Sequence, residues 1–281
     1  MTRTSNMINR TSNIINRTSG RFLVASVLVL FSACQKVINV KLSPGASKYV
    51  VQGVITDQPG TCSVYITTTK DFSADNTFPG VSGATVKVES DGTVYTLTET
   101  TPGTYTTSAI TGTPDKTYNM TAIVDGNTYT ASSTMPQPVG MDSMYVSKRA
   151  LTDKLYATVV YTDPAGIPNY YRWVQYVNGL KEKTIFVSDD QLTDGLTIKG
   201  QLNYNNDTDD PNRDIRIGDT VRLDMICLDS AVYNYWYSLN IEASGNGSAN
   251  SPGNPISNIK GGCLGYFSAQ TVRTKTLIVQ K

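Results

Sequence analysis

Residues 83–98 read Gly83-Ala-Thr-Val-Lys-Val-Glu-Ser-Asp-Gly-Thr-Val-Tyr-Thr-Leu-Thr98, and this stretch decides the fold class. Two runs that alternate apolar and polar side chains flank Asp91-Gly92, a dipeptide that supplies the positive φ angles of a type I′ turn. A two-residue turn places Val86 opposite Leu97, so the register agrees with the hydrophobic pattern. The stretch therefore predicts an antiparallel β-hairpin with one buried face.

Similar runs lie on both sides of this hairpin, and glycine-containing turn signals separate them. They cover residues 48–56, 62–68, 103–105, 117–124 and 128–131. These runs are rich in threonine, which suits the solvent-facing positions of antiparallel strands and suits helices poorly. We predict that residues 48–135 form an immunoglobulin-like or transthyretin-like β-sandwich, and we expect this part to fold on its own.

A domain boundary is predicted at residues 135–138, which read Met-Pro-Gln-Pro, because two prolines remove backbone donors that a central strand needs. Residues 140–281 then form a second, antiparallel β-rich domain with one short helix. Asp229 or Ser230 can cap that helix, since apolar residues recur at helical spacing from there to Ala243.

The second domain contains another hairpin signal, Asn178-Gly179, between two apolar runs within residues 170–187. If a two-residue turn joins two regular strands here, Tyr171 pairs with Phe186. It also places Trp173 on the same face as these two side chains. This aromatic face predicts either core packing or a surface for sugar or peptide.

The N-terminal region has the pattern of a lipoprotein signal. An uncharged run, residues 22–33, follows four arginines and ends in small residues before Cys34. The run is too short to span a bilayer as a helix, which takes about 20 residues. We predict that residues 1–33 are a signal peptide, that Cys34 carries a lipid and that residues 34–47 are a tether. The lipid would then hold the protein to a membrane without a transmembrane helix.

The composition excludes several classes of function. Four of the 24 basic residues and none of the 23 acidic ones precede Cys34, which leaves 20 basic against 23 acidic residues, a net charge of −3. This balance argues against nucleic acid as a partner. The chain has no histidine, which excludes Ser-His-Asp and Cys-His catalysis. No glycine-rich phosphate loop follows a predicted strand, so we predict a protein that is not an enzyme and has no cofactor.

Three cysteines follow Cys34, namely Cys62, Cys227 and Cys263. This odd number allows at most one disulfide within the chain. Cys227 shares one face of a predicted strand, residues 221–227, with three apolar side chains, so we predict that it is buried as a small hydrophobic residue.

An acidic segment, residues 205–214, is the best metal candidate in the sequence. Asp207, Asp209 and Asp210 offer the oxygen ligands that calcium prefers. An EF-hand needs glycine at its sixth position and glutamate at its twelfth, and the segment supplies neither. We interpret it as a solvated loop, with calcium binding as the alternative.

Short motifs spread over the mature chain carry a family resemblance. They are Cys34-Gln-Lys-Val-Ile-Asn-Val40, Tyr49-Val-Val-Gln-Gly-Val-Ile-Thr56, Gly83-Ala-Thr-Val86, Gly103-Thr-Tyr105, Asp163-Pro164, Asn169-Tyr-Tyr-Arg172, Val232-Tyr-Asn-Tyr-Trp236 and the stretch from Asn254 to Ala269. With these motifs the chain resembles the Bacteroidota lipoproteins of domain of unknown function 4249 (DUF4249). The resemblance implies a lipid-anchored outer-membrane protein without established activity, typically encoded beside a TonB-dependent receptor. Whether it faces the periplasm or the cell surface is left open.

Aromatic side chains on both sides of the glycine-rich loop, residues 245–255, are the candidate binding residues, because aromatic anchors dominate interfaces. They are Tyr235, Trp236, Tyr266 and Phe267, together with Trp173 of the second hairpin. We predict a non-enzymatic accessory or ligand-binding lipoprotein. The alternatives are a carboxylate-based hydrolase of polysaccharide or peptide, and a structural or adhesive surface protein.

Overall fold

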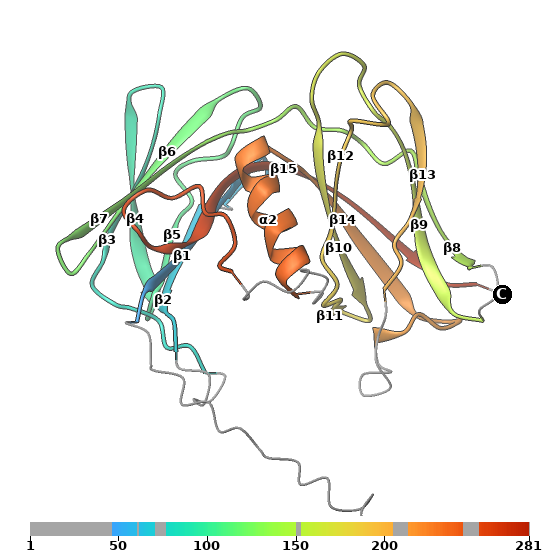
Figure 1. Cartoon of the computed structure of the whole chain (residues 1–281), viewed down its shortest axis with the longest axis horizontal. Helices are drawn as coiled ribbons and strands as arrows, with labels where there is room; N and C mark the ends of the chain where they lie inside the picture. The colour runs from blue at the N-terminus through green and yellow to red at the C-terminus, as the bar shows by residue number, and fades with distance from the viewer. Residues whose placement is uncertain are drawn as a thin grey trace, which may run out of the picture. The chain divides into compact units, whose positions relative to one another are not determined.

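The computed structural model describes residues 47–60, 62–70, 77–149, 153–204, 213–243 and 253–280 (Figure 1). The predicted signal peptide, Cys34 and all of the predicted tether except Ser47 lie outside the described residues, as does most of the glycine-rich loop. Residues 46–281 form one compact unit. Among the described residues, no helix has the length and apolar character needed to cross a membrane.

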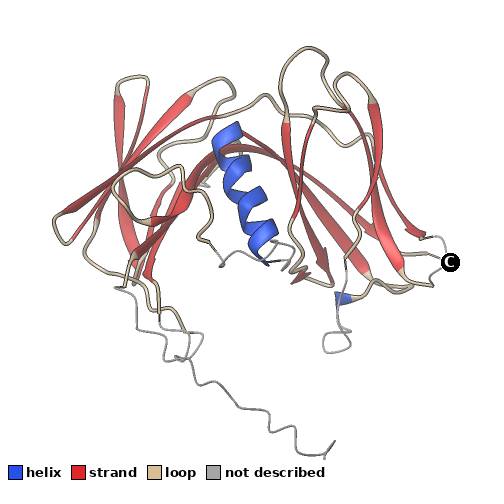
Figure 2. Ribbon diagram, viewed as in Figure 1, coloured by secondary structure: helices blue, strands red, loops and turns tan. Residues whose placement is uncertain are grey.

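The described residues are mainly β, which confirms the predicted fold class (Figure 2). The first seven strands are β1 (Tyr49–Thr56), β2 (Cys62–Thr68), β3 (Thr85–Ser90), β4 (Thr93–Thr101), β5 (Thr104–Thr107), β6 (Thr117–Val124) and β7 (Asn127–Thr134). The later strands are β8 (Ser143–Lys148), β9 (Leu155–Thr162), β10 (Tyr170–Val177), β11 (Leu180–Lys181), β12 (Phe186–Asp189), β13 (Thr197–Gln201), β14 (Thr220–Leu228) and β15 (Leu264–Ile278). A single α-helix, α2 (Ser230–Ala243), lies among the residues that the structure describes.

The strands form two sheets. The larger has the order β11-β10-β14-β15-β1-β2-β5-β4-β3-β6-β7, with β12 also paired to β10, and the smaller has the order β13-β9-β8. The hairpin of β3 and β4 has the predicted register, with Val86 opposite Leu97, and both side chains are buried. Asp91 and Gly92 have positive φ angles of 50° and 77°, as the type I′ turn requires.

The long strand β15 links the two predicted domains. Its first half pairs in parallel with β1, from Val50 opposite Leu264 to Thr56 opposite Gln270. Its second half pairs antiparallel with β14. Asp57 stabilises β15 where its pairing changes from β1 to β14. The Asp57 carboxylate accepts a 3.0 Å hydrogen bond from the Val272 backbone nitrogen and forms an ion pair with Arg273.

The core of the N-terminal part is completed by C-terminal residues. Its cluster of buried side chains from β1–β7 also contains Ile259, Cys263, Phe267 and Ala269. Phe267 is fully buried and lies opposite Gly53 of β1, where an added Cβ would come within 2.7 Å of the Phe267 ring. The predicted boundary near residues 135–138 separates β7 from β8, but the core on its N-terminal side includes part of β15.

The register of the second hairpin differs from the prediction. Val177 lies opposite Leu180 as a two-residue turn requires, but Phe186 pairs with Trp173 instead of Tyr171. The Glu182 backbone nitrogen still donates a 2.8 Å hydrogen bond to the Gln175 backbone oxygen, and residues 183–185 then leave the ladder before β12. They curl around the buried Glu182 carboxylate, which accepts hydrogen bonds from the backbone nitrogens of residues 183 and 184 at 2.9 and 3.0 Å. This local carboxylate, which the hydrophobic pattern does not reveal, shifts the pairing by two residues.

Helix α2 begins where the sequence predicts. The Asp229 carboxylate accepts a 2.9 Å hydrogen bond from the Val232 backbone nitrogen, which is the geometry of an N-cap. The helix lies against β10, β12 and β15, and Val232 is fully buried in a cluster with Val174 and Ile226. Helix α2 thereby covers one face of the sheet at β10 and β14 (Figure 1).

The three cysteines Cys62, Cys227 and Cys263 are free and buried, as predicted for Cys227. Burial raises the pKa of Cys62 and Cys263 to about 11 and also raises the pKa of Cys227. At pH 8 the folded protein therefore contains little thiolate, which is the reactive form.

We expect these three thiols to stay unmodified by iodoacetamide at pH 8 in the native protein and to react fully in guanidinium chloride. The measurement is mass spectrometry of a Cys34→Ser variant, in which no fourth thiol contributes. Rapid alkylation of the native variant at any of the three positions would contradict the buried placement.

Candidate functional site

Strand β10 presents alternate side chains to two different environments. Trp173 is buried against the rings of Tyr161 and Tyr171, with ring centroids 5.9 and 5.8 Å away. Arg172 and Val174 project from the other face of the strand, where α2 lies. The two faces follow from the period of two along a strand.

A pocket of about 350 Å³ lies beside Arg172, between β10, the irregular segment after β11 and helix α2. This volume is at the small end of the range of about 300–1,000 Å³ for ligand sites. Its lining residues are Arg172, Trp173, Val174, Lys181, Glu182, Lys183, Thr184, Ile185 and Trp236. The irregular register of residues 182–185 contributes one wall, so the pocket depends on the departure from regular pairing.

Aromatic rings surround the Arg172 side chain. Its guanidinium carbon lies 3.5 Å from the centroid of the Trp236 ring, a cation–π contact. Trp236 in turn contacts Tyr266, with ring centroids 5.1 Å apart, and Tyr235 contacts Tyr266 at 4.8 Å. Residues from β10 and α2 thus meet at this pocket although they are distant in sequence, and Tyr266 of β15 packs against Trp236 without lining the pocket.

Two buried donor atoms at this place lack partners. Arg172 Nε and Trp236 Nε1 are buried and have no hydrogen-bond partner, and neither Arg172 nor Lys181 forms an ion pair with the part of the chain that the structure describes. Burial lowers the pKa of Arg172. Burial and the nearby Arg172 charge lower the pKa of Lys181. Two positive charges therefore face one pocket. The buried Glu182 carboxylate also lines this pocket, but among the described residues it forms no ion pair with Arg172 or Lys181.

A larger cavity, of about 740 Å³, lies beside Tyr204, Ile215 and Ile217. Asp153, Lys154 and Asp214 also line it. None of its described lining residues carries a buried polar atom without a partner. The smaller pocket is therefore the better candidate for a ligand site, because it has buried polar atoms that a ligand could bind. The larger volume of the other cavity does not outweigh this difference.

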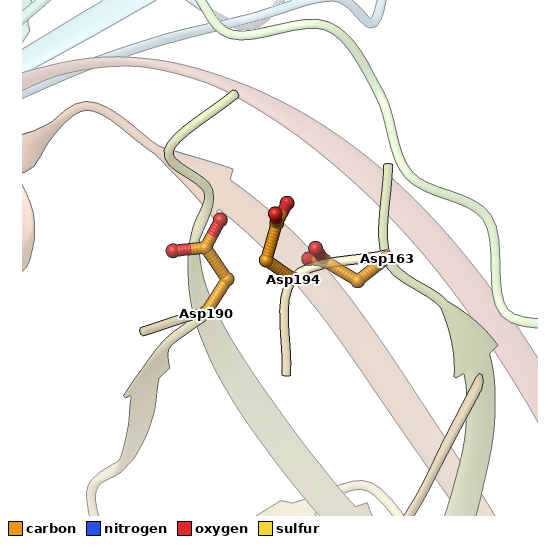
Figure 3. A group of neighbouring side chains, drawn as sticks. All are labelled: Asp163, Asp190 and Asp194. Carbon is orange, nitrogen blue, oxygen red and sulfur yellow. The ribbon is translucent and has the colours of Figure 1, made fainter. Parts of the chain in front are cut away.

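Three carboxylates could hold a metal ion. Oxygen atoms of Asp163, Asp190 and Asp194 all lie within 4.8 Å of one another, and Figure 3 shows the three side chains close together. The calcium candidates named from sequence, Asp207, Asp209 and Asp210, lie outside the described residues. No pattern in the sequence indicates this second group, because Asp163 lies far along the chain from Asp190 and Asp194, which share the connection between β12 and β13.

Comparison with known proteins identifies the family. The model of domain of unknown function DUF4249 matches residues 35–276. The chain belongs to the DUF4249 family. No curated protein sequence shows significant similarity to it. A crystal structure from Bacteroides uniformis, whose description suggests that it binds carbohydrate, is 12% identical and covers 82% of this chain and 98% of its own, with a TM-score of 0.19.

In this DUF4249 protein the structure brings together three of the five predicted binding residues. The rings of Tyr235, Trp236 and Tyr266 contact one another, and of the three only Trp236 lines the pocket. Phe267 is fully buried in the N-terminal core. Trp173 belongs to a second hydrophobic cluster, with Tyr161 and Tyr171, and also lines the pocket. For Phe267 the reason is the alternation along β15, which turns neighbouring residues to opposite faces.

Sequence reasoning missed Arg172 and Lys181 of the DUF4249 chain. Arg172 ends the motif Asn169-Tyr-Tyr-Arg172, one of those that carry the family resemblance, so a signal for it was available. Lys181 follows the Asn178-Gly179 turn and has no comparable signal. Its place in the pocket depends on the irregular segment that follows it.

Proposed function

We propose that this protein is a lipid-anchored binding protein of the cell envelope that holds a small anionic ligand in the Arg172 pocket and catalyses no reaction. The observation that carries the proposal is that Arg172 and Lys181 line the same pocket, and that neither cation has an ion-pair partner among the described residues. Arg172 is half-buried and Lys181 is exposed. An unpaired charge costs more the more it is buried, so a bound anion would stabilise Arg172 most.

The hydrogen-bonding atoms at the pocket point to the same kind of ligand. Arg172 Nε and Trp236 Nε1 are donors that cannot accept, and both are buried without a partner. A carboxylate or a phosphate offers acceptors to both and matches the positive charge. Since the aromatic rings keep Arg172 in place, the site is organised before a ligand arrives.

Tryptophan fluorescence tests this proposal directly. The chain has two tryptophans, and both border the pocket. We expect glucuronate or glucose 6-phosphate to change the fluorescence with a saturable dependence, while glucose, which lacks the negative charge, has at most a tenth of their affinity. Lys181→Met is expected to weaken binding of the acids about tenfold or more, because a hydrogen bond to a charged group is worth roughly 1.5–3 kcal/mol.

A matched control is available on the neighbouring strand. Arg222 lies 3.8 Å from the ring centroid of Tyr176, which is the same kind of cation–π contact, but it does not line the pocket. Arg222→Gln should therefore leave binding unchanged. Equal binding of glucose and the two acids, or no fluorescence change with any of them, would contradict an anion site at Arg172.

The proposed anchor makes a separate prediction. Cys34→Ala should abolish attachment to the membrane, because the lipid on Cys34 is the only proposed anchor. The measurement is palmitate labelling together with fractionation of membranes, and the wild-type chain serves as the control. Palmitate label that persists in the variant would show that the lipid is attached elsewhere.

A TonB-dependent receptor remains the partner that we propose for the anchored protein. Co-purification of the lipidated protein from outer membranes tests this, and a receptor recovered in stoichiometric amount would support it. The binding pocket does not depend on the outcome, because its residues all lie within this chain.

A further inference from the structure

Three aspartates gather at one end of the strands β9, β12 and β13. Asp163 follows β9, Asp190 follows β12, and Asp194 lies in the turn before β13. Asp163 and Asp190 are 2% and 6% exposed, whereas Asp194 is exposed. Because β9 and β13 belong to the smaller sheet and β12 to the larger one, the group lies where the two sheets meet.

The hydrogen bonds to these carboxylates come from neutral groups. Asp163 accepts from the Tyr171 hydroxyl and, at 3.2 Å, from the backbone nitrogen of residue 195. Asp190 accepts from the backbone nitrogen of Asn169 at 2.7 Å. Asp194 accepts from the backbone nitrogen of residue 166 at 2.7 Å. These bonds fix the positions of the carboxylates, but they bring no positive charge.

No lysine or arginine of the described residues forms an ion pair with the three aspartates. Three negative charges, two of them buried, thus lie within 4.8 Å of one another without a cation. Buried charges in proteins are normally paired or coordinate a metal. A separation of 4.8 Å is also about twice the calcium–oxygen distance of roughly 2.4 Å, so the three oxygens fit around a single ion.

Asn169 provides an independent observation. This residue is 6% exposed, and its side-chain oxygen Oδ1 is buried without a hydrogen-bond partner. Asn169 directly precedes β10 and contacts the group, because its backbone nitrogen donates the 2.7 Å hydrogen bond to the Asp190 carboxylate. An unpartnered amide oxygen therefore lies beside the carboxylate group, where a carboxylate cannot donate to it and a cation can bind it.

We propose that Asp163, Asp190, Asp194 and Asn169 form a calcium site that clamps the two sheets together. Four oxygen ligands from the protein, completed by water, suit a hard cation. Calcium is preferred over magnesium because the ligands come from two separate connections of the chain, and calcium tolerates irregular geometry that magnesium does not. Because the four residues do not line the Arg172 pocket, the calcium proposal does not depend on the proposed function, and either one can fail without the other.

Calorimetry and thermal melting of the full chain in detergent test the site with calcium, magnesium and EDTA. We expect one calcium ion to bind with a dissociation constant of about 10⁻⁴–10⁻³ M, the range of extracellular calcium modules. At 10 mM calcium the melting temperature should then rise by roughly 3–10 °C over that in EDTA. Magnesium at the same concentration should give less than half of this rise.

Asp194→Asn is the decisive variant, because its side chain is exposed and the change should not prevent folding. It should weaken calcium binding at least tenfold. Asp153→Asn removes another exposed carboxylate, one that pairs with Lys148 outside the group, and should leave calcium binding unchanged. Absence of calcium binding in the wild-type protein, or unchanged affinity in Asp194→Asn, would overturn the proposal.

Discussion

Replacing Gly265 with alanine is expected to remove most of the stability of this protein, by roughly 4 kcal/mol or more. Gly265 has a φ of 104°, and an added Cβ would lie 1.9 Å from the backbone oxygen of Val51. The contact is with backbone of the paired strand β1, which cannot rotate away as a side chain can. Relief of the clash requires β15 to separate from β1. Chemical denaturation followed by circular dichroism measures the change.

Gly262→Ala is the matched control for this substitution. Gly262 also has a positive φ, of 90°, but no atom lies within 4 Å of an added Cβ. It should therefore show only the conformational cost of a left-handed residue, about 1–2 kcal/mol. If Gly265→Ala destabilises the protein no more than Gly262→Ala does, the close approach of β15 to β1 is wrong.

A fragment of residues 48–135 is expected not to fold cooperatively, contrary to the expectation from its strand and turn signals. Without β15 the fragment loses the seven residue pairs that join β1 to β15. It also loses Phe267, which fills the core against Gly53, and a missing buried phenylalanine side chain alone costs roughly 3–5 kcal/mol. The exposed edge of β1 would in addition favour aggregation.

Co-expression with a second fragment, residues 136–281, provides the comparison, since it supplies β15 in trans. We expect the two fragments to purify together and to show one cooperative thermal transition, while residues 48–135 alone bind a hydrophobic dye and melt without a transition. A sharp melt of the first fragment alone would show that its core is sufficient without β15.

Local signals in the sequence determined much of the fold. The turns at Asp91-Gly92 and Asn178-Gly179 and the helix cap at Asp229 form as predicted, because each depends on residues only a few positions apart. The same holds for the mainly β character, since alternation of apolar and polar residues is a property of each strand by itself.

Strand β15 could not be predicted in this way. Three glycines at residues 261, 262 and 265 indicate unusual backbone, and their φ angles of 107°, 90° and 104° confirm this. The sequence does not show that the segment which follows pairs with β1. The hydrogen bond between Asp57 and Val272 joins residues 215 positions apart, and no local pattern encodes such a contact.

The candidate sites show the same difference between local signals in the sequence and contacts that form only in the folded chain. The sequence by itself pointed to Trp236 and Tyr266, because large aromatic residues beside a glycine-rich loop are recognisable one at a time. Only the tertiary structure placed Arg172 over the Trp236 ring and brought Asp163 to Asp190. A binding or metal site is a set of distances between side chains from separate strands, and the order of residues along a chain does not contain those distances until the sheets have formed.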